Sequence, residues 1–212
     1  MAKPKAAARS AGRPKVDNPE LREHLLDVAL KSFAASGVTA TSVRSIAADA
    51  GVNAALLSYY FGNKAEVVEA VFDERIAPVL SQFFLHLFAM EGDIQQFTTA
   101  FVIGIGELVE AHPWYPALWV REVLCEGGAL RELAVARLAA ATPLVTMRFV
   151  DAQRDGELNA ALDPTEMVMT LLGLTLVPAA GAPLWQATSG GPAASTARRT
   201  QHVLSLLQRG LS

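Results

Sequence analysis

Side chains that could contact a nucleic acid gather between Ser42 and Lys64. The planar guanidinium of Arg44 has the fork of N–H donors that engages the major-groove edge of guanine. Tyr59 and Tyr60 each carry a hydroxyl on a rigid ring. The ammonium of Lys64 falls in the first turn of a predicted helix, where its charge opposes the helix dipole, so a phosphate is a better partner than the helix itself.

The local sequence predicts that two short helices and a tight turn position these side chains. Ser42 and Asn53 have side chains that cap helix N-termini. Gly51 falls where the first helix must stop, since glycine adopts positive φ without a Cβ penalty. Leu57 and Phe61, four residues apart, predict the buried face of the second helix. This is the shape of a helix-turn-helix, although spacing alone leaves an ordinary αα-hairpin equally open.

The outward face of the second predicted helix carries Ala54, Ala55, Ser58 and Tyr59. Small residues on such a face let a helix enter the DNA major groove, where base edges can be read.

The wider residue pattern resembles the DNA-binding domain of the TetR family of transcriptional regulators. The resemblance covers roughly residues 20–72 and is carried by Ile46-Ala47, Ala50-Gly51-Val52 and Tyr59-Tyr60-Phe61-Gly62-Asn63-Lys64. It implies that Ser42, Tyr60 and Lys64 contact phosphates and that Arg44 reaches a base or a phosphate. It also implies that Ala54, Ala55 and Tyr59 face the bases. Together with residues taken from the local sequence and the N-terminal tail, the candidate DNA-binding residues are Arg13, Ser42, Arg44, Asn53, Ala54, Ala55, Ser58, Tyr59, Tyr60 and Lys64.

Two departures from the family pattern bear on specificity. Many members have Gly-Thr-Leu-Tyr where this chain has Ala55-Leu56-Leu57-Ser58, and His where it has Tyr60. Few polar groups remain on the reading face. We therefore expect thymine methyl contacts and DNA shape to carry more of the specificity.

Charge is distributed unevenly along the 212 residues, whose net charge is −3. Residues 1–64 hold nine Lys or Arg and five Asp or Glu, a net of +4, whereas residues 65–212 hold nine and sixteen, a net of −7. Only the N-terminal part is therefore expected to meet a polyanion. Residues 1–18 predict a flexible basic tail, in which Gly12-Arg13-Pro14-Lys15 is similar to an AT-hook that places Arg13 in the minor groove. A solvated tail that only aids solubility is the alternative.

Periodicity predicts an all-α fold of about nine helices, with no strand pattern. The predicted organisation is the tail (1–18), a three-helix helix-turn-helix domain (19–63) and a helical ligand-binding and dimerisation domain (64–212). We expect a helix from about 129 to 154 bent at Pro143, a helix from Asp163 to about 178, a loop from Gly181 to Pro192, and a last helix capped by Ser195.

The segment between Glu166 and Arg198 contains no charged residue. Its length approaches that of a membrane span, but Pro178, Gly181 and Pro183 interrupt it, so a buried helix is favoured and no membrane partner is expected. The apolar excess of residues 163–178 and 195–209 predicts a homodimer built from these last two helices. The alternative is that the first of them forms the centre of a monomeric core.

We expect a ligand cavity among the middle helices, and its apolar character favours a small hydrophobic or aromatic effector. The candidate lining residues are Phe101, Ile105, His112, Trp114, Trp119, Glu122, Cys125, Met147, Met167 and Thr170. Packing in the core is the alternative for each of them.

The four histidines are scattered, no phosphate loop or nucleophile elbow is visible, and Cys125 is the single cysteine. We therefore expect no enzyme activity, no metal and no cofactor. The cysteine content and the absence of an apolar leader predict a cytoplasmic protein. The sequence thus predicts a ligand-responsive repressor that binds a palindromic operator as a dimer. A helical protein-interaction adaptor is the alternative, and a small-molecule enzyme is a more remote one.

Overall fold

The computed structural model describes residues 18–191 and 194–210. The predicted basic tail, with Arg13, lies outside the described residues apart from Asn18. Within these ranges the chain forms α-helices and two π-helical segments and contains no strand, as the periodicity predicted. The helices are α1 (Pro19–Ser36), α2 (Val43–Asp49), α3 (Ala54–Phe61), α4 (Lys64–Val71), η1 (Phe72–Ile76), α5 (Ala77–Phe88), α6 (Ile94–Ala111), α7 (Tyr115–Trp119), η2 (Val120–Leu124), α8 (Arg131–Leu138), α9 (Ala141–Arg154), α10 (Met167–Ala180), α11 (Ala182–Ser189) and α12 (Thr196–Gly210).

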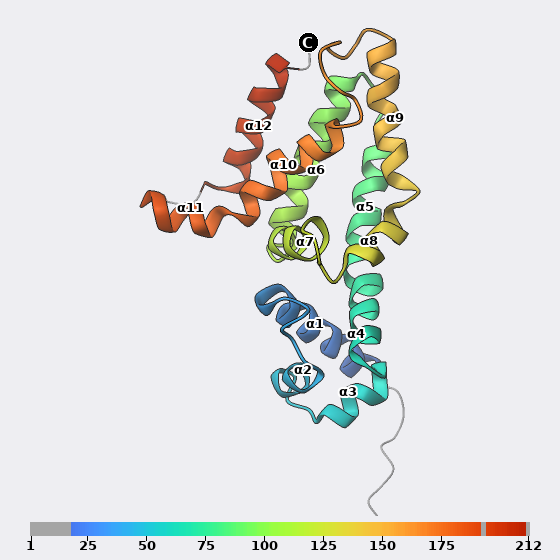
Figure 1. Ribbon diagram of the computed structural model, residues 1–212, viewed down its shortest axis with the longest axis vertical. Coiled ribbons are helices and arrows are strands. Elements are labelled where there is room, and N and C mark those ends of the chain that lie inside the picture. Colours follow the sequence, from blue (N-terminus) through green and yellow to red (C-terminus); the bar gives the residue numbers. More distant parts are fainter. Residues whose placement is uncertain (1–17, 192–193, 211–212) are drawn as a thin grey trace, which may run out of the picture.

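The first three helices form the lower end of the molecule in Figure 1, and α7 lies directly above α1. The segments α4, η1 and α5 follow one another without a break and connect the lower end to the upper helices (Figure 1). We refer to these three segments as the α4–η1–α5 rod. In η1 each backbone hydrogen bond joins residues five apart in the sequence, where an α-helix joins residues four apart, and this is the usual form of a π-bulge.

Local sequence determines where several helices begin. Asn18 caps α1, with Pro19 at the first position, because its side chain accepts from the Leu21 amide. Asp93 and Gln96 form a capping box at the start of α6. Ser195 accepts from the Arg198 amide at 3.2 Å, as expected for the cap of α12.

Proline positions explain why the structure has more helices than the nine or so expected. The predicted helix over 129–154 is two helices, α8 and α9, separated at residues 139–140 rather than bent at Pro143. The loop predicted from Gly181 to Pro192 contains α11, and α10 begins at Met167 rather than at Asp163. Pro143 and Pro183 lie in the first turns of α9 and α11, where a missing N–H costs nothing.

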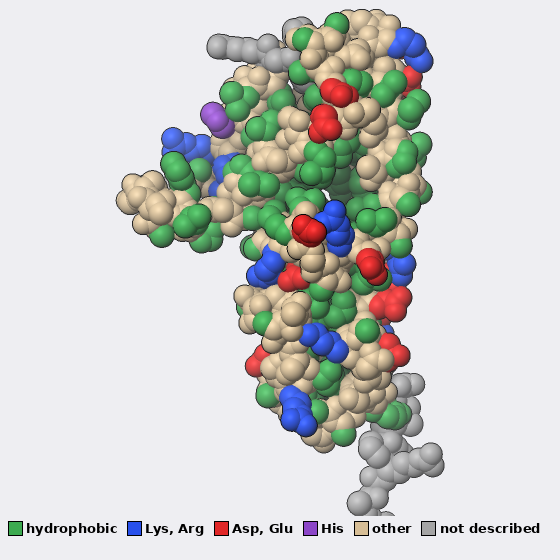
Figure 2. All heavy atoms as spheres, viewed as in Figure 1, with side chains coloured by type: hydrophobic (Ala, Val, Ile, Leu, Met, Phe, Trp, Pro, Cys, Tyr) green, Lys and Arg blue, Asp and Glu red, His purple; other side chains and the backbone are tan. Residues whose placement is uncertain are grey.

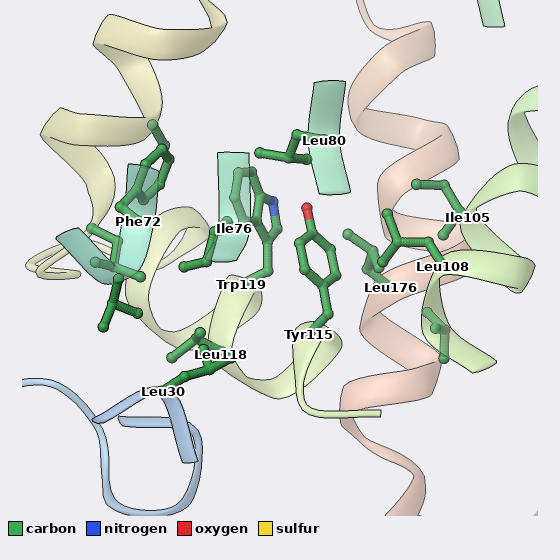
Figure 3. Packing of buried hydrophobic residues seen from close by; sticks show 14 of the residues in the cluster. Leu30, Phe72, Ile76, Leu80, Ile105, Leu108, Tyr115, Leu118, Trp119 and Leu176 are labelled. Atoms are coloured by element: carbon green, nitrogen blue, oxygen red, sulfur yellow. The ribbon is translucent and has the colours of Figure 1, made fainter. Parts of the chain in front are cut away.

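One hydrophobic cluster runs through the chain from α1 to α12. Leu25, Phe33 and Leu57 fill the centre of the first three helices and are completely buried. Where α1 meets the upper helices, Leu30 of α1 lies close to Leu118 of α7, and Trp119 lies beside Ile76 (Figure 3). The two ends of the molecule therefore share apolar contacts instead of meeting through a solvated joint.

Across residues 18–191 and 194–210, no single helix has both the length and the apolar character to cross a membrane. Two bent pairs, α8 with α9 and α10 with α11, pass that test by length and composition only when their members are taken together.

Candidate nucleic-acid interface and cavity

The turn between α2 and α3 has the predicted local geometry. Ser42 and Ser45 form a reciprocal capping box at the start of α2, with the Ser45 amide 3.0 Å from Ser42 Oγ. Gly51, the residue after the α2 cap, adopts φ +69°. Asn53 Oδ1 accepts from the Leu56 amide at 2.7 Å and so starts α3. These local bonds fix the angle at which α3 leaves the turn.

The two faces of α3 differ as the sequence predicted. Leu57 is completely buried, and Phe61 is 6% exposed. On the other face Ala55 and Ser58 are exposed, and Tyr59 has a relative exposure of 67%. The exposed face thus carries small side chains around one large ring, and its polar groups are two hydroxyls.

The candidate DNA-binding residues around α3 differ in exposure and in whether their polar groups form hydrogen bonds within the chain. Asn53 is exposed and Ala54 half-buried, while Arg44 is exposed on the neighbouring α2. Tyr60 Oη accepts from the backbone amide of Asn18 at 3.1 Å, so this ring also anchors the start of α1. Lys64 Nζ donates to the Thr39 carbonyl at 3.0 Å, a contact the sequence did not suggest.

Charged side chains join α1 to the α4–η1–α5 rod. Arg22 donates two bonds to the Glu74 carboxylate, one of them at 2.6 Å, and its guanidinium lies 5.1 Å from the centroid of the Phe61 ring. Its hydrogen bond holds the pKa of Glu74 below the usual range for a carboxyl. Arg75 bonds both Glu23 and Asp27, at 2.6 and 2.8 Å. Two side chains of η1, those of Glu74 and Arg75, therefore fix the orientation of α1 relative to the rod.

A cavity of about 780 Å³ lies between α5 and α6. Its lining includes apolar side chains such as Phe83, Leu87 and Ile103 and polar ones such as Glu107 and His112. Its lining residues are Val79, Gln82, Phe83, His86, Leu87, Met90, Asp93, Gln95, Gln96, Thr99, Ala100, Ile103, Gly104, Glu107, Leu108, Ala111 and His112. The volume falls within the usual range for small-molecule sites.

Comparison with known proteins finds a family match for the N-terminal helices. The family model described as bacterial regulatory proteins, tetR family, matches residues 25–71, which run from α1 to the end of α4. Residues 25–71 are therefore similar to the DNA-binding domain of TetR family regulators. The matched residues include the whole of the α2–α3 unit.

A curated relative and several solved structures resemble this chain. The transcriptional regulator AcrR of Shigella flexneri is 35% identical over 63 residues, which are 30% of this chain and 29% of that protein. The match thus spans less than a third of the relative's length.

Two solved structures cover nearly the whole chain. The fatty acid degradation regulator FadR of Bacillus halodurans aligns over 93% of this chain and 98% of its own, with TM-score 0.66 and 19% identity. The ketosteroid regulator KstR2 of Mycobacterium tuberculosis covers 93% and 97%, with TM-score 0.71 and 20% identity. At these identities the likeness establishes a shared fold.

One of the ten candidate ligand residues, His112, lines the cavity. The others lie elsewhere: Phe101, Ile105, Trp119 and Met167 are buried in the core, Trp114 is half-buried, and Cys125, Met147 and Thr170 are exposed. Ile105 also borders a much smaller cavity against α10 and α12. Glu122 is buried and bonds α1, as described below.

Sequence reasoning missed Phe83, His86 and Glu107. The aromatic run Phe83-Phe84 on α5 was a signal for this wall, but periodicity does not show which helix lies opposite.

Proposed function

We propose that this chain is a cytoplasmic transcriptional repressor of the TetR family, which binds a palindromic DNA operator as a two-fold dimer and responds to a small-molecule effector. The observation that carries the proposal is the exposed face of α3. It combines small side chains with one exposed tyrosine on a helix that two capping residues hold at a fixed angle. A helix with such a face fits the major groove.

The contacts that we assign to DNA are of two kinds. Ser42, Tyr60 and Lys64 surround the ends of α2 and α3 and are assigned to phosphates, which position the protein without reading sequence. Tyr60 and Lys64 also form hydrogen bonds within the chain, but these bonds leave both side chains able to contact phosphates. The Tyr60 oxygen accepts from Asn18, so its O–H can still donate, and Lys64 uses one of three donors on Thr39.

Base contacts are assigned to Arg44 and to the α3 face. Arg44 is exposed and can offer two N–H groups to a guanine. Ala54, Ala55 and the ring of Tyr59 are suited to thymine methyl groups, and Ser58 offers one hydroxyl. A reading face with so few polar groups favours a site whose sequence is also read through the shape of its grooves.

Dimerisation is assigned to α10 and α12, which pack side by side against α6. In the single chain Met169 and Val177 of α10 are 54% and 48% exposed, and Leu206 of α12 is 51% exposed. These exposed apolar side chains lie on two neighbouring helices, and contact with a partner would remove them from water. A two-fold contact would bury them twice and place two α3 helices for half-sites about one DNA turn apart.

The effector site is assigned to the cavity between α5 and α6, which replaces most of the lining set that the sequence suggested. Its apolar side chains suit a hydrophobic or aromatic molecule. Gln82, His86, Glu107 and His112 supply the polar groups that would orient it. An effector changes DNA affinity only by the difference between its affinities for the two conformations.

Selection of genomic DNA fragments by the purified protein tests the proposal. The wild type should enrich one short palindrome at moderate salt, and the Arg44→Ala/Tyr59→Ala double variant should enrich none. Arg131→Ala is the matched control, because Arg131 is exposed on α8, away from α2 and α3. Equal enrichment by the wild type and the double variant would exclude α3 as the reading helix and favour the adaptor alternative.

Native mass spectrometry tests the effector site. We expect a small molecule to accompany the wild type purified from its own cytoplasm. Ile103→Trp, which places an indole in the cavity, should lose it. Leu85→Trp is the control, since Leu85 is 70% exposed on α5 and does not line the cavity. Retention of the molecule by Ile103→Trp would place the effector elsewhere.

A further inference from the structure

Glu122 is a buried carboxylate that bonds two separate parts of the chain. Its relative exposure is 4%, and it lies in the π-helical segment η2. Oε1 accepts from the backbone amide of Val38, just beyond α1, at 3.1 Å. Oε2 accepts from the Ala129 amide at 3.2 Å, and Arg121 Nε donates to Oε1 at 3.0 Å. A buried charge with partners on all sides is held firmly in place, since losing one is costly.

Arg121, the preceding residue, holds the other side of the same joint. Its Nη2 donates to the carbonyl of Phe33 at 2.6 Å and to that of Ala34 at 3.1 Å. These carbonyls belong to the last turn of α1, and that of Phe33 also accepts from the Gly37 amide at 2.9 Å. A cation is also favoured there by the helix dipole. We call Arg121 and Glu122 the clasp. Arg121 bonds two carbonyls in the last turn of α1, and Glu122 bonds the Val38 amide just beyond it.

Gly37 makes this close approach possible. It adopts φ +87°, which glycine tolerates, and it ends α1 between the two residues of the clasp. A Cβ placed on it would lie 3.1 Å from Glu122 Oε1 and 3.3 Å from Arg121 Nε. The absence of a side chain at this residue lets the two charged groups reach the backbone.

Ring contacts connect the clasp to the cavity. His112, which lines the cavity, has its ring centroid 5.5 Å from that of Trp114. Trp114 lies 5.8 Å from Tyr115, and Tyr115 stacks on Trp119 at 5.2 Å. Trp119 is the residue before η2, and both it and Tyr115 are buried (Figure 3). Packed rings transmit a displacement because the interior offers no free volume to absorb it.

We infer that the clasp is a second connection through which occupancy of the cavity acts on α1, separate from the α4–η1–α5 rod. Arg121 and Glu122 act as positioning residues and do not contact DNA or effector. A shift of η2 must either move the end of α1 or leave Glu122 without its partner on Val38. Since α1 packs against α2 and η1, moving its end changes how α3 is presented. This inference rests on the proposed function.

A double-mutant cycle tests the connection. Ile103→Trp fills the cavity, and Arg121→Ala opens the clasp. The cycle compares four proteins: the wild type, each single variant and the double variant. Two quantities are measured for each: the dissociation constant for the operator recovered by the selection, and the hydrogen-exchange rate of residues 33–41 without DNA. Arg131→Ala replaces Arg121→Ala in a matched cycle, because Arg131 contacts the Cys125 carbonyl and not α1.

We expect Ile103→Trp to change both quantities at least threefold when Arg121 is present and less than 1.5-fold when it is alanine. The Arg131→Ala cycle should show the full change in both backgrounds. An unchanged exchange rate on filling the cavity, or an equal change with and without Arg121, would overturn the inference. A purely structural role would lower stability without removing the dependence on residue 103.

Exchange without DNA separates this inference from the proposed function. If no operator is recovered but the exchange rates still couple, the clasp stands and the DNA-binding assignment falls. If Arg121→Ala does not fold, Arg121→Gln takes its place, since its shorter uncharged side chain cannot bond both carbonyls of α1. Circular dichroism at the assay temperature decides which variant is used.

Discussion

Replacement of Gly62 by alanine should destabilise the junction between α3 and α4 more than any other single methyl added near α2 and α3. Gly62 adopts φ +79° and ψ −104°, a conformation that costs an L-residue about 1–3 kcal/mol. Its added Cβ would also lie 1.7 Å from Glu66 Oε2. That oxygen accepts from the Asn63 amide at 3.0 Å in the capping box that begins α4.

The Glu66 side chain is flexible and can move away, so the clash itself is avoidable. The cost of moving is the loss of its bond to Asn63, about 0.5–1.5 kcal/mol. Together with the backbone strain, Gly62→Ala should lower the free energy of unfolding by roughly 2–4 kcal/mol. Urea denaturation, with all variants at one protein concentration, measures this quantity.

Two controls separate the contributions. Gly51→Ala imposes a positive φ of +69° on alanine but meets no atom within 4 Å, so it should cost the strain alone. In a Glu66→Ala background, Gly62→Ala should likewise lose only the strain contribution. The reasoning is refuted if Gly62→Ala costs no more than Gly51→Ala, or if removing Glu66 leaves its cost unchanged.

Three further outcomes are expected. Gly128→Ala should destabilise the protein by about 2 kcal/mol or more, because its Cβ would lie 2.2 Å from the Glu122 carbonyl oxygen, which is backbone and cannot move aside. The control Gly127→Ala, with φ +76° and no atom within 4 Å, should cost less. Thermal denaturation of both variants measures the difference. The hydrogen bond from Arg22 lowers the pKa of Glu74 in the folded protein, so the stability that this bond contributes is full above the unfolded pKa and is lost as pH falls through the lower folded pKa. Glu74→Gln should therefore weaken the dependence of the free energy of unfolding on pH in the acid range. An unchanged pH dependence would contradict this. Operator affinity should fall steeply with salt, with a log–log slope of about −0.9 per phosphate neutralised, and a slope near zero would speak against phosphate contacts.

Local features of the structure were predictable from sequence because their physics is local. Ser42, Asn53, Asn63 and Asp93 each cap a helix through atoms two or three residues away. The buried face of α3 follows from the spacing of apolar residues along one helix. The caps and this face required no knowledge of the rest of the chain.

Features set by distant contacts were not predictable in this way. The cavity lies between α5 and α6, and its walls include half-buried and exposed residues such as Ile103 that periodicity assigns to no core. Phe101 and Ile105 were chosen as lining residues because they are apolar, but both are buried and neither lines the cavity, although the Phe101 ring packs against Phe83. Tyr60 bonds a residue 42 positions earlier, and Glu122 bonds one 84 positions earlier. Single-sequence patterns contain no signal for such pairs.

Proline was ambiguous for a different reason. A proline breaks a helix interior but is accepted in its first turn. Pro183 therefore marks the beginning of α11, whereas Pro78 follows the π-helical segment η1 within the continuous rod and does not end the helix. The resulting α11 has no buried residue and carries Leu184 and Trp185 with exposures of 71% and 72%, and it projects from the molecule with hydrophobic side chains on its surface (Figures 1 and 2).

The π-helical segment η1 sets how far α5 is rotated about the axis of the rod relative to α4. A turn of this kind contains one residue more than an α-turn, and each residue rotates a helix by about 100°. Everything beyond Phe72–Ile76 is therefore turned, relative to α4, by about that angle compared with an unbroken α-helix. Loss of a single residue within η1 would leave both ends folded yet point the wall of the cavity in another direction. The orientation of α5 and the helices packed on it relative to α3 thus depends on an insertion one residue long.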